Sequence, residues 1–167
     1  MKNVFPIGLL ILLVSCSTDD EKAIGEFTGN ELVYNLSQSS DFPISGTVSF
    51  LERTDKAVQV EVALEGTEGD IFHPVHLHFG DLSVPDADIA VLLNDLQGSE
   101  GTSITLVTNL SDDTPFTFDS VDKFNGSVKV HLGADGPDRD VILASGNVGM
   151  NKLVTTGRQK VAICKSN

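Results

Sequence analysis

The sequence has few basic residues, few cysteines and few histidines. Its 11 lysines and arginines stand against 24 acidic residues, which gives a net charge of −13. Such a surface disfavours binding to nucleic acid or anionic lipid, and it gives anionic substrates no long-range attraction. A Gly-x-Ser-x-Gly motif and a phosphate-binding glycine loop are also absent, so the motifs of serine hydrolases and of nucleotide-binding proteins are missing. The candidates for chemistry are therefore the four histidines.

An apolar run over residues 5–14 follows Lys2 near the N-terminus. It is too short to cross a bilayer as a helix, which takes about 20 residues. The run ends in Leu13-Val14-Ser15-Cys16, which resembles the lipobox cut by the lipoprotein signal peptidase. We therefore predict that residues 1–15 are a signal peptide and that Cys16 becomes the lipid-acylated first residue. The alternative is an ordinary cleaved signal peptide in which this cysteine is incidental.

The polar residues 16–27 would then form a tether between the lipid and the folded domain. Their acidic start resembles the surface-export signal of some bacterial lipoproteins. We expect a cell-envelope protein that contacts the outer membrane through its lipid anchor and faces either the periplasm or the cell surface. The sequence identifies no protein partner. An acylated Cys16 would leave Cys164 unpaired, so no internal disulfide is expected despite the oxidising compartment.

Residues 28–167 are expected to form one all-β domain. Apolar and polar residues alternate over 44–50 and 57–64, on either side of a short polar turn, and this predicts a hairpin with one wet face. Further runs are separated by Gly and Asp turns with no long helical period, and one helical turn is expected within 118–124. The pattern predicts a β-sandwich or barrel with strands at 31–36, 44–50, 57–64, 74–79, 88–95, 103–109, 127–132, 141–145 and 152–163.

Three of the four histidines lie in one predicted strand, His73-Pro74-Val75-His76-Leu77-His78. Residues two apart on a strand share a face, so His76 and His78 should both point away from the apolar row. In a later strand, His131 shares the polar row with Lys129, which we expect to be an exposed lysine. If the two strands are neighbours, three imidazoles converge on the outer face of the sheet. Neutral imidazole binds copper or zinc, and binding should weaken as the pH drops through about 6.5.

The histidine strand is similar to a known metal-binding sequence. His73 to Asp81 resembles the copper-ligand strand of Cu/Zn superoxide dismutases, which has a histidine three residues before a His-x-His pair. Val128 to His131 with the following Asp135 is similar to that family's late strand, and Ser145 to Gly149 resembles its Gly-Asn-Ala-Gly segment. A closer likeness is to bacterial secreted proteins with CHRD-type domains. Both resemblances imply an all-β, Cu/Zn superoxide dismutase-like Greek-key sandwich or barrel.

The resemblance also implies roles for individual residues. His76, His78 and His131 would be copper ligands. His73 matches a histidine that is structural in the dismutase family, and Asp135 matches an aspartate that orients a ligand imidazole, as metal sites commonly require.

Other parts of the dismutase site are missing. Residues 82–101, where the resemblance would place a bridging histidine and the zinc ligands, contain no histidine, and Asn151 stands where the family has its active-site arginine. We therefore expect a copper site without the family's zinc site, with weak or no superoxide dismutation, and we assign no catalytic residue. Two alternatives stay open. One is a non-enzymatic CHRD-type interaction module with vestigial histidines, and the other is a structural zinc site.

Overall fold

Eight strands and two single helical turns make up the part of the chain that the structure describes. The structure is a computed structural model, and it describes residues 26–150. The elements are β1 (Phe27–Gln38), β2 (Ser45–Arg53), β3 (Val58–Glu65), β4 (Phe72–Phe79), β5 (Ile89–Gln97), β6 (Thr102–Val107), α1 (Phe118–Val121), β7 (Asn125–His131), α2 (Gly136–Arg139) and β8 (Ile142–Gly149). The strands close into one antiparallel barrel in the order β1-β2-β3-β6-β5-β4-β7-β8. The predicted all-β class is confirmed.

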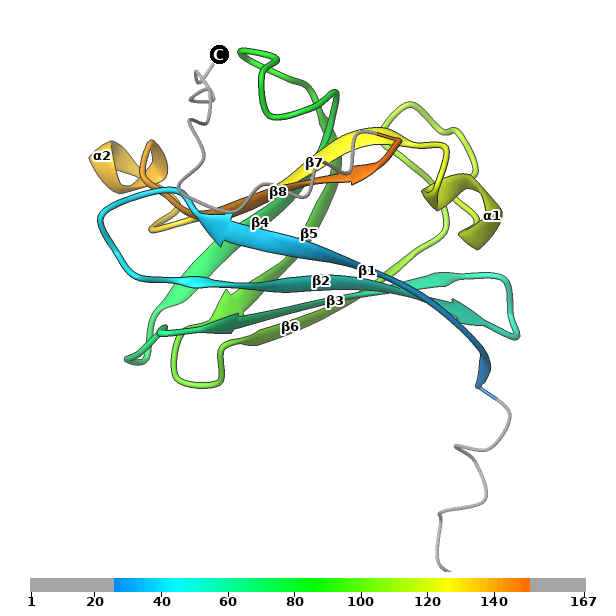
Figure 1. Ribbon diagram of the computed structural model, residues 1–167, viewed down its shortest axis with the longest axis horizontal. Coiled ribbons are helices and arrows are strands. Elements are labelled where there is room, and N and C mark those ends of the chain that lie inside the picture. The colour runs from blue at the N-terminus through cyan, green and yellow to red at the C-terminus, as the bar shows by residue number, and fades with distance from the viewer. Residues whose placement is uncertain (1–25, 151–167) are drawn as a thin grey trace, which may run out of the picture.

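Two thin seams divide this barrel into halves. β1 and β8 share two residue pairs and β5 and β6 share one, whereas longer ladders join the other neighbours. One half therefore contains β1, β2, β3 and β6, and the other contains β5, β4, β7 and β8, which Figure 1 shows as two facing layers. The chain crosses between the halves in the β3–β4, β5–β6 and β6–β7 connections. The second half holds all four histidines.

The core follows from the alternation of side chains along the strands, which is clearest in β3. In β3, Val58, Val60, Val62 and Leu64 are buried, while the residues between them are half-buried or exposed. A strand turns successive side chains to opposite faces, so one face of each strand lines the barrel interior. Full burial of one such aliphatic side chain contributes about 1.5–3 kcal/mol. The hydrophobic contacts between the two halves therefore hold the barrel together where the seams provide few hydrogen bonds.

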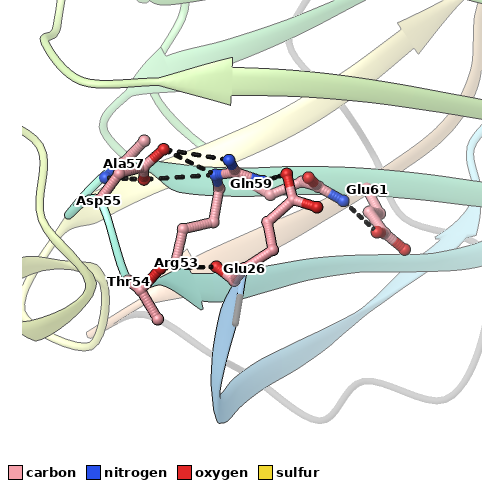
Figure 2. A network of polar contacts seen from close by, with 7 residues as sticks. All are labelled: Glu26, Arg53, Thr54, Asp55, Ala57, Gln59 and Glu61. Carbon is pink, nitrogen blue, oxygen red and sulfur yellow. Dashed lines mark hydrogen bonds and ion pairs between the residues drawn. The ribbon is translucent and has the colours of Figure 1, made fainter. Parts of the chain in front are cut away.

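A polar network fastens the start of β1 to the β2–β3 hairpin. Arg53, at the end of β2, forms ion pairs with Glu26 and Asp55 (Figure 2). Its guanidinium carbon also lies 5.6 Å from the ring centre of Phe27. The network lies in the half of the barrel without histidines, so its role is to fix the strand register there.

The strands predicted over 31–145 are all present, and the helical turn expected within 118–124 is α1. β8 differs because it continues to Gly149, with Asn147 paired opposite Ser127 of β7. The segment that resembles Gly-Asn-Ala-Gly is therefore part of a strand. The predicted signal peptide with Cys16, most of the tether, Asn151, Cys164 and the strand expected at 152–163 lie outside the described residues.

Candidate metal centre

β4 and β7 lie side by side and place their histidines on the same face. Val75 and Leu77 of β4 pair with Val130 and Val128 of β7, and all four of these side chains are buried in the core. Alternation turns the intervening residues to the opposite face of the sheet. That face therefore carries His76 and His78 from β4, and Lys129 and His131 from β7.

The three imidazoles of His76, His78 and His131 meet on this face. One nitrogen from each ring can be chosen so that all three atoms lie within 4.8 Å of one another. The ring centre of His76 is 4.8 Å from that of His131 and 5.7 Å from that of His78. Metal–nitrogen bonds are about 2.0–2.1 Å long, so three nitrogens this close can share one ion. The predicted convergence of the three histidines is confirmed.

Backbone carbonyl groups orient two of these rings. His78 donates from Nδ1 to the carbonyl of Ala87 at 2.9 Å, and His131 donates from Nδ1 to the carbonyl of Arg139 at 2.6 Å. A carbonyl only accepts, so the hydrogen of each neutral ring is on Nδ1 and the lone pair is on Nε2. The two carbonyls come from the β4–β5 and β7–β8 connections. These connections therefore set the tautomer that a metal ligand needs.

Two nitrogens in the cluster are buried without a hydrogen-bond partner, namely Nδ1 of His76 and Nε2 of His131. A buried polar atom without a partner costs about 1–3 kcal/mol, and proteins satisfy almost all such atoms. Both atoms belong to residues of the group that could hold an ion. A metal ion would satisfy both of them, so the residues present fit a metal.

Burial keeps these imidazoles neutral. It lowers the pKa of His76 to about 4, and the neighbouring charges of His131, His78, Arg139 and Lys129 act in the same direction. Burial likewise lowers the pKa of His78 to about 4, against an opposing hydrogen bond to Ala87. The pKa of His131 is also lowered, mainly by burial. Neutral imidazole is the form that ligates metals, so the site is ready to bind at neutral pH.

The expectation that Lys129 is an exposed lysine is wrong. Lys129 is 0% exposed, and His78 and His131 are 0% and 1% exposed. The outer row of β4 and β7 is therefore a buried polar layer and not a wet face. The Ala87 and Arg139 contacts show that the two adjoining connections reach the histidines of this layer.

His73 and Asp135 lie apart from the cluster. His73 is buried, and its Nδ1 donates to the carbonyl of Leu132 at 2.9 Å. This contact ties β4 to the residue that follows His131, as a structural histidine would. Asp135 is exposed at the start of α2, and its side chain makes no hydrogen bond in the described residues. The imidazole of His131 is oriented by the carbonyl of Arg139, and the role of Asp135 in orienting a ligand imidazole stays a prediction.

Sequence reasoning missed the contributions of Ala87 and Arg139. Ala87 acts through its backbone, which every residue type carries, so no residue pattern could have revealed it. The carbonyl of Arg139 likewise acts through the backbone. The charge of Arg139, eight residues after His131, was the only part of its contribution that the sequence could have indicated.

The three-histidine cluster is the only group of three or more potential metal-ligating side chains within residues 26–150. No helix in this part of the chain is long and apolar enough to span a membrane. Comparisons of the chain with protein-family models, curated proteins and solved structures find no match.

Proposed function

We propose that this barrel binds one copper ion through His76, His78 and His131. The observation that carries the proposal is the convergence of three imidazole nitrogens within 4.8 Å, in rings that also contain two buried nitrogens without a hydrogen-bond partner. Imidazole ligands suit copper and zinc, and divalent copper binds such sites more tightly than zinc does. The resemblance of the two histidine strands to the copper strands of Cu/Zn superoxide dismutases supports copper as the metal.

The same resemblance supports a dismutase-like architecture. Strands β4 to β7 lie in the spatial order β7-β4-β5-β6, which is the order of a Greek key. We propose weak or no superoxide dismutation, because residues 82–101 offer no histidine for a second metal or for a bridging ligand. No residue is assigned as catalytic.

We also propose that the protein is an outer-membrane lipoprotein attached through Cys16. The support is the apolar run over residues 5–14 and the lipobox-like sequence that ends at Cys16. A polar tether to a lipid would hold the metal-binding barrel close to the membrane.

A second candidate function is that of an interaction module whose histidines no longer bind metal. Leu92 on β5 and Ile104 and Leu106 on the neighbouring β6 are 69%, 54% and 55% exposed. Exposed aliphatic side chains on adjacent strands favour a protein contact.

Metal content separates the two functions. The full chain, purified from the bacterial envelope, is analysed for copper and zinc and then titrated with each metal. We expect about one copper ion per chain, and loss of binding in a His76→Ala/His131→Ala variant. His73→Gln is the matched control, because it removes a histidine but keeps a donor for the Leu132 carbonyl. Equal metal binding by the parent and the double variant would leave the interaction module as the function.

A further inference from the structure

Lys129 lies on the same face of the sheet as the three histidines and is buried like His78 and His131. It pairs with His76 of β4 on one side and with Ser145 of β8 on the other. Directly opposed residues in an antiparallel pair have Cβ atoms about 4.5–5.5 Å apart, and Lys129 also shares a face with His131, two residues along β7. Because Lys129 is fully buried, its ammonium group acts on the site with little screening by water.

Arg139 brings a second positive charge to the same place. Its carbonyl accepts the hydrogen bond from His131, and its half-buried side chain extends from the same residue. The charges of Lys129 and Arg139 both lower the pKa of His76 and of His131. Asp140 opposes them at His131, but more weakly than either cation. Within the described residues, the group that could hold a metal includes no carboxylate.

The ligand set itself is neutral and small. Three imidazoles supply three nitrogens, and two of the three histidines are almost fully buried. Divalent copper favours four ligands in a square or tetragonal arrangement, whereas monovalent copper is stable with two or three. A dry site with three neutral ligands therefore fits the monovalent ion better.

We infer that the buried charge of Lys129, assisted by Arg139, makes the three-histidine site selective for Cu(I) over divalent metal ions. The inference rests on the proposed metal-binding function and concerns which ion is bound, so it involves no redox step. A fixed positive charge repels a dication twice as strongly as a monocation at the same distance.

The test compares Cu(I) and Zn(II) affinities of the parent and of Lys129→Met, a variant that keeps the length of the side chain and removes its charge. Both ions have filled d shells, so charge is the main difference between them. Affinities are measured in the full chain without oxygen, by competition with a chromophoric chelator for each ion. The His76→Ala/His131→Ala variant gives the background binding by thiols. Lys123→Gln is the matched control, because it removes the same charge from an exposed position.

We expect Lys129→Met to raise Cu(I) affinity about tenfold and Zn(II) affinity about a hundredfold, since the dication gains twice in free energy. Each tenfold change in the ratio of Cu(I) to Cu(II) affinities should lower the reduction potential of the bound copper by 59 mV. Arg139→Gln should shift both affinities in the same sense by smaller factors, and it decides the matter if Lys129→Met does not fold. Lys123→Gln should change neither affinity.

Two failures are distinguishable. If the parent binds neither ion more tightly than the double-histidine variant does, the proposed function itself is wrong. If the parent binds metal but the ratio of Cu(I) to Zn(II) affinity is the same in Lys129→Met, Arg139→Gln and the parent, only the selectivity inference is overturned.

Discussion

At the scale of single residues, the imidazoles of His78 and His131 are held by backbone carbonyl groups and not by acidic side chains. A carbonyl fixes the tautomer without adding a negative charge beside the ring. The rings therefore stay neutral, and nothing in the hydrogen-bond pattern raises their pKa to the level that a neighbouring carboxylate would produce. Burial then lowers the pKa of His76 and His78 to about 4.

Metal binding should therefore resist acid. A histidine with an ordinary pKa of about 6.5 starts to exchange metal for protons just below that pH. With a pKa of about 4, His76 and His78 stay neutral until the solution is much more acidic. Zn(II) affinity, measured by chelator competition from pH 7.5 to pH 4, should hold to about pH 5 and then fall steeply. Histidines with an unperturbed pKa would instead lose Zn(II) affinity from about pH 6.5 downward. A decline that begins at pH 6.5 would contradict the burial of these rings.

The metal-free protein should lose stability as the pH falls from about 6.5 to about 4. The pKa of His76 is about 6.5 in the unfolded chain and about 4 in the folded one. Between these values the unfolded chain binds more protons, so the free energy of unfolding decreases as the pH falls and is unaffected above about 6.5. We expect His76 to contribute a loss of about 2 kcal/mol between pH 6.5 and pH 4 in urea denaturation, after allowance for partial exposure of the ring, and His78, whose pKa is also about 4, adds to this loss. His76→Gln, which cannot titrate, should show a shallower slope.

At the scale of elements, the β4–β5 connection acts as a support for the site. Its carbonyl at Ala87 holds His78, and its backbone N–H at Leu82 donates to Oδ1 of Asn147 on β8 at 2.8 Å. The second contact fixes the connection against the strand next to β7. Asn147 therefore acts on the metal centre through the path of the chain and not by touching a ligand.

Asn147→Ala should lower copper affinity by up to about tenfold, the low end of the effect of removing a direct partner of a metal ligand, because Asn147 acts on His78 only through the β4–β5 connection. The expected loss of stability is about 1 kcal/mol for one hydrogen bond. Asn109→Ala is the matched control, since Asn109 also bonds to a backbone group, the carbonyl of Asp113, but in another connection. Chelator competition and urea denaturation measure the two effects. If both variants reduce affinity equally, the support does not run through Asn147.

At the scale of the whole molecule, the protein is strongly acidic, while two positively charged side chains, Lys129 and Arg139, act on its metal centre. The net charge of −13 repels anions at long range, and Lys129, the cation inside the site, is fully buried. Long-range steering raises the association rates of charged substrates by about 10–10³, and this protein has the wrong sign for an anionic substrate.

The copper-loaded protein should therefore dismute superoxide slowly. We expect a second-order rate constant far below the diffusional ceiling of about 10⁸–10⁹ M⁻¹s⁻¹, measured by pulse radiolysis at two ionic strengths. Added salt should leave the rate unchanged or increase it slightly, because salt screens repulsion. A fast rate that decreases with salt would show attraction and contradict this prediction.

Attachment to the membrane is a prediction about a part of the chain outside the described residues. Cys16→Ser should abolish fatty-acid labelling and recovery in the membrane fraction, because an acidic domain has no other electrostatic route onto anionic lipid. Labelling with a radioactive fatty acid and fractionation measure both effects, with Cys164→Ser as the control. Unchanged membrane recovery of the Cys16→Ser protein would refute the lipid anchor.

Alternation of residue type was enough to predict the strands and their two faces. Val75 and Leu77 point one way and His76 and His78 the other because a pleated strand permits nothing else. The same rule placed His131 on the histidine side of β7. These histidines can converge only if β4 and β7 are neighbours in the sheet. The strand order of the barrel shows that they are.

The environment of the site depended on tertiary structure. Period-two alternation identifies two faces of a strand but not what lies over each one, so Lys129 was expected in solvent and is buried. The partners of His78 and His131 are backbone carbonyls, which carry no residue signal and depend on the path of two connections. The sequence thus determined which side chains can meet. Only the folded chain decided that they meet in a dry, positively charged place, because burial and electrostatic fields arise from segments brought together by folding.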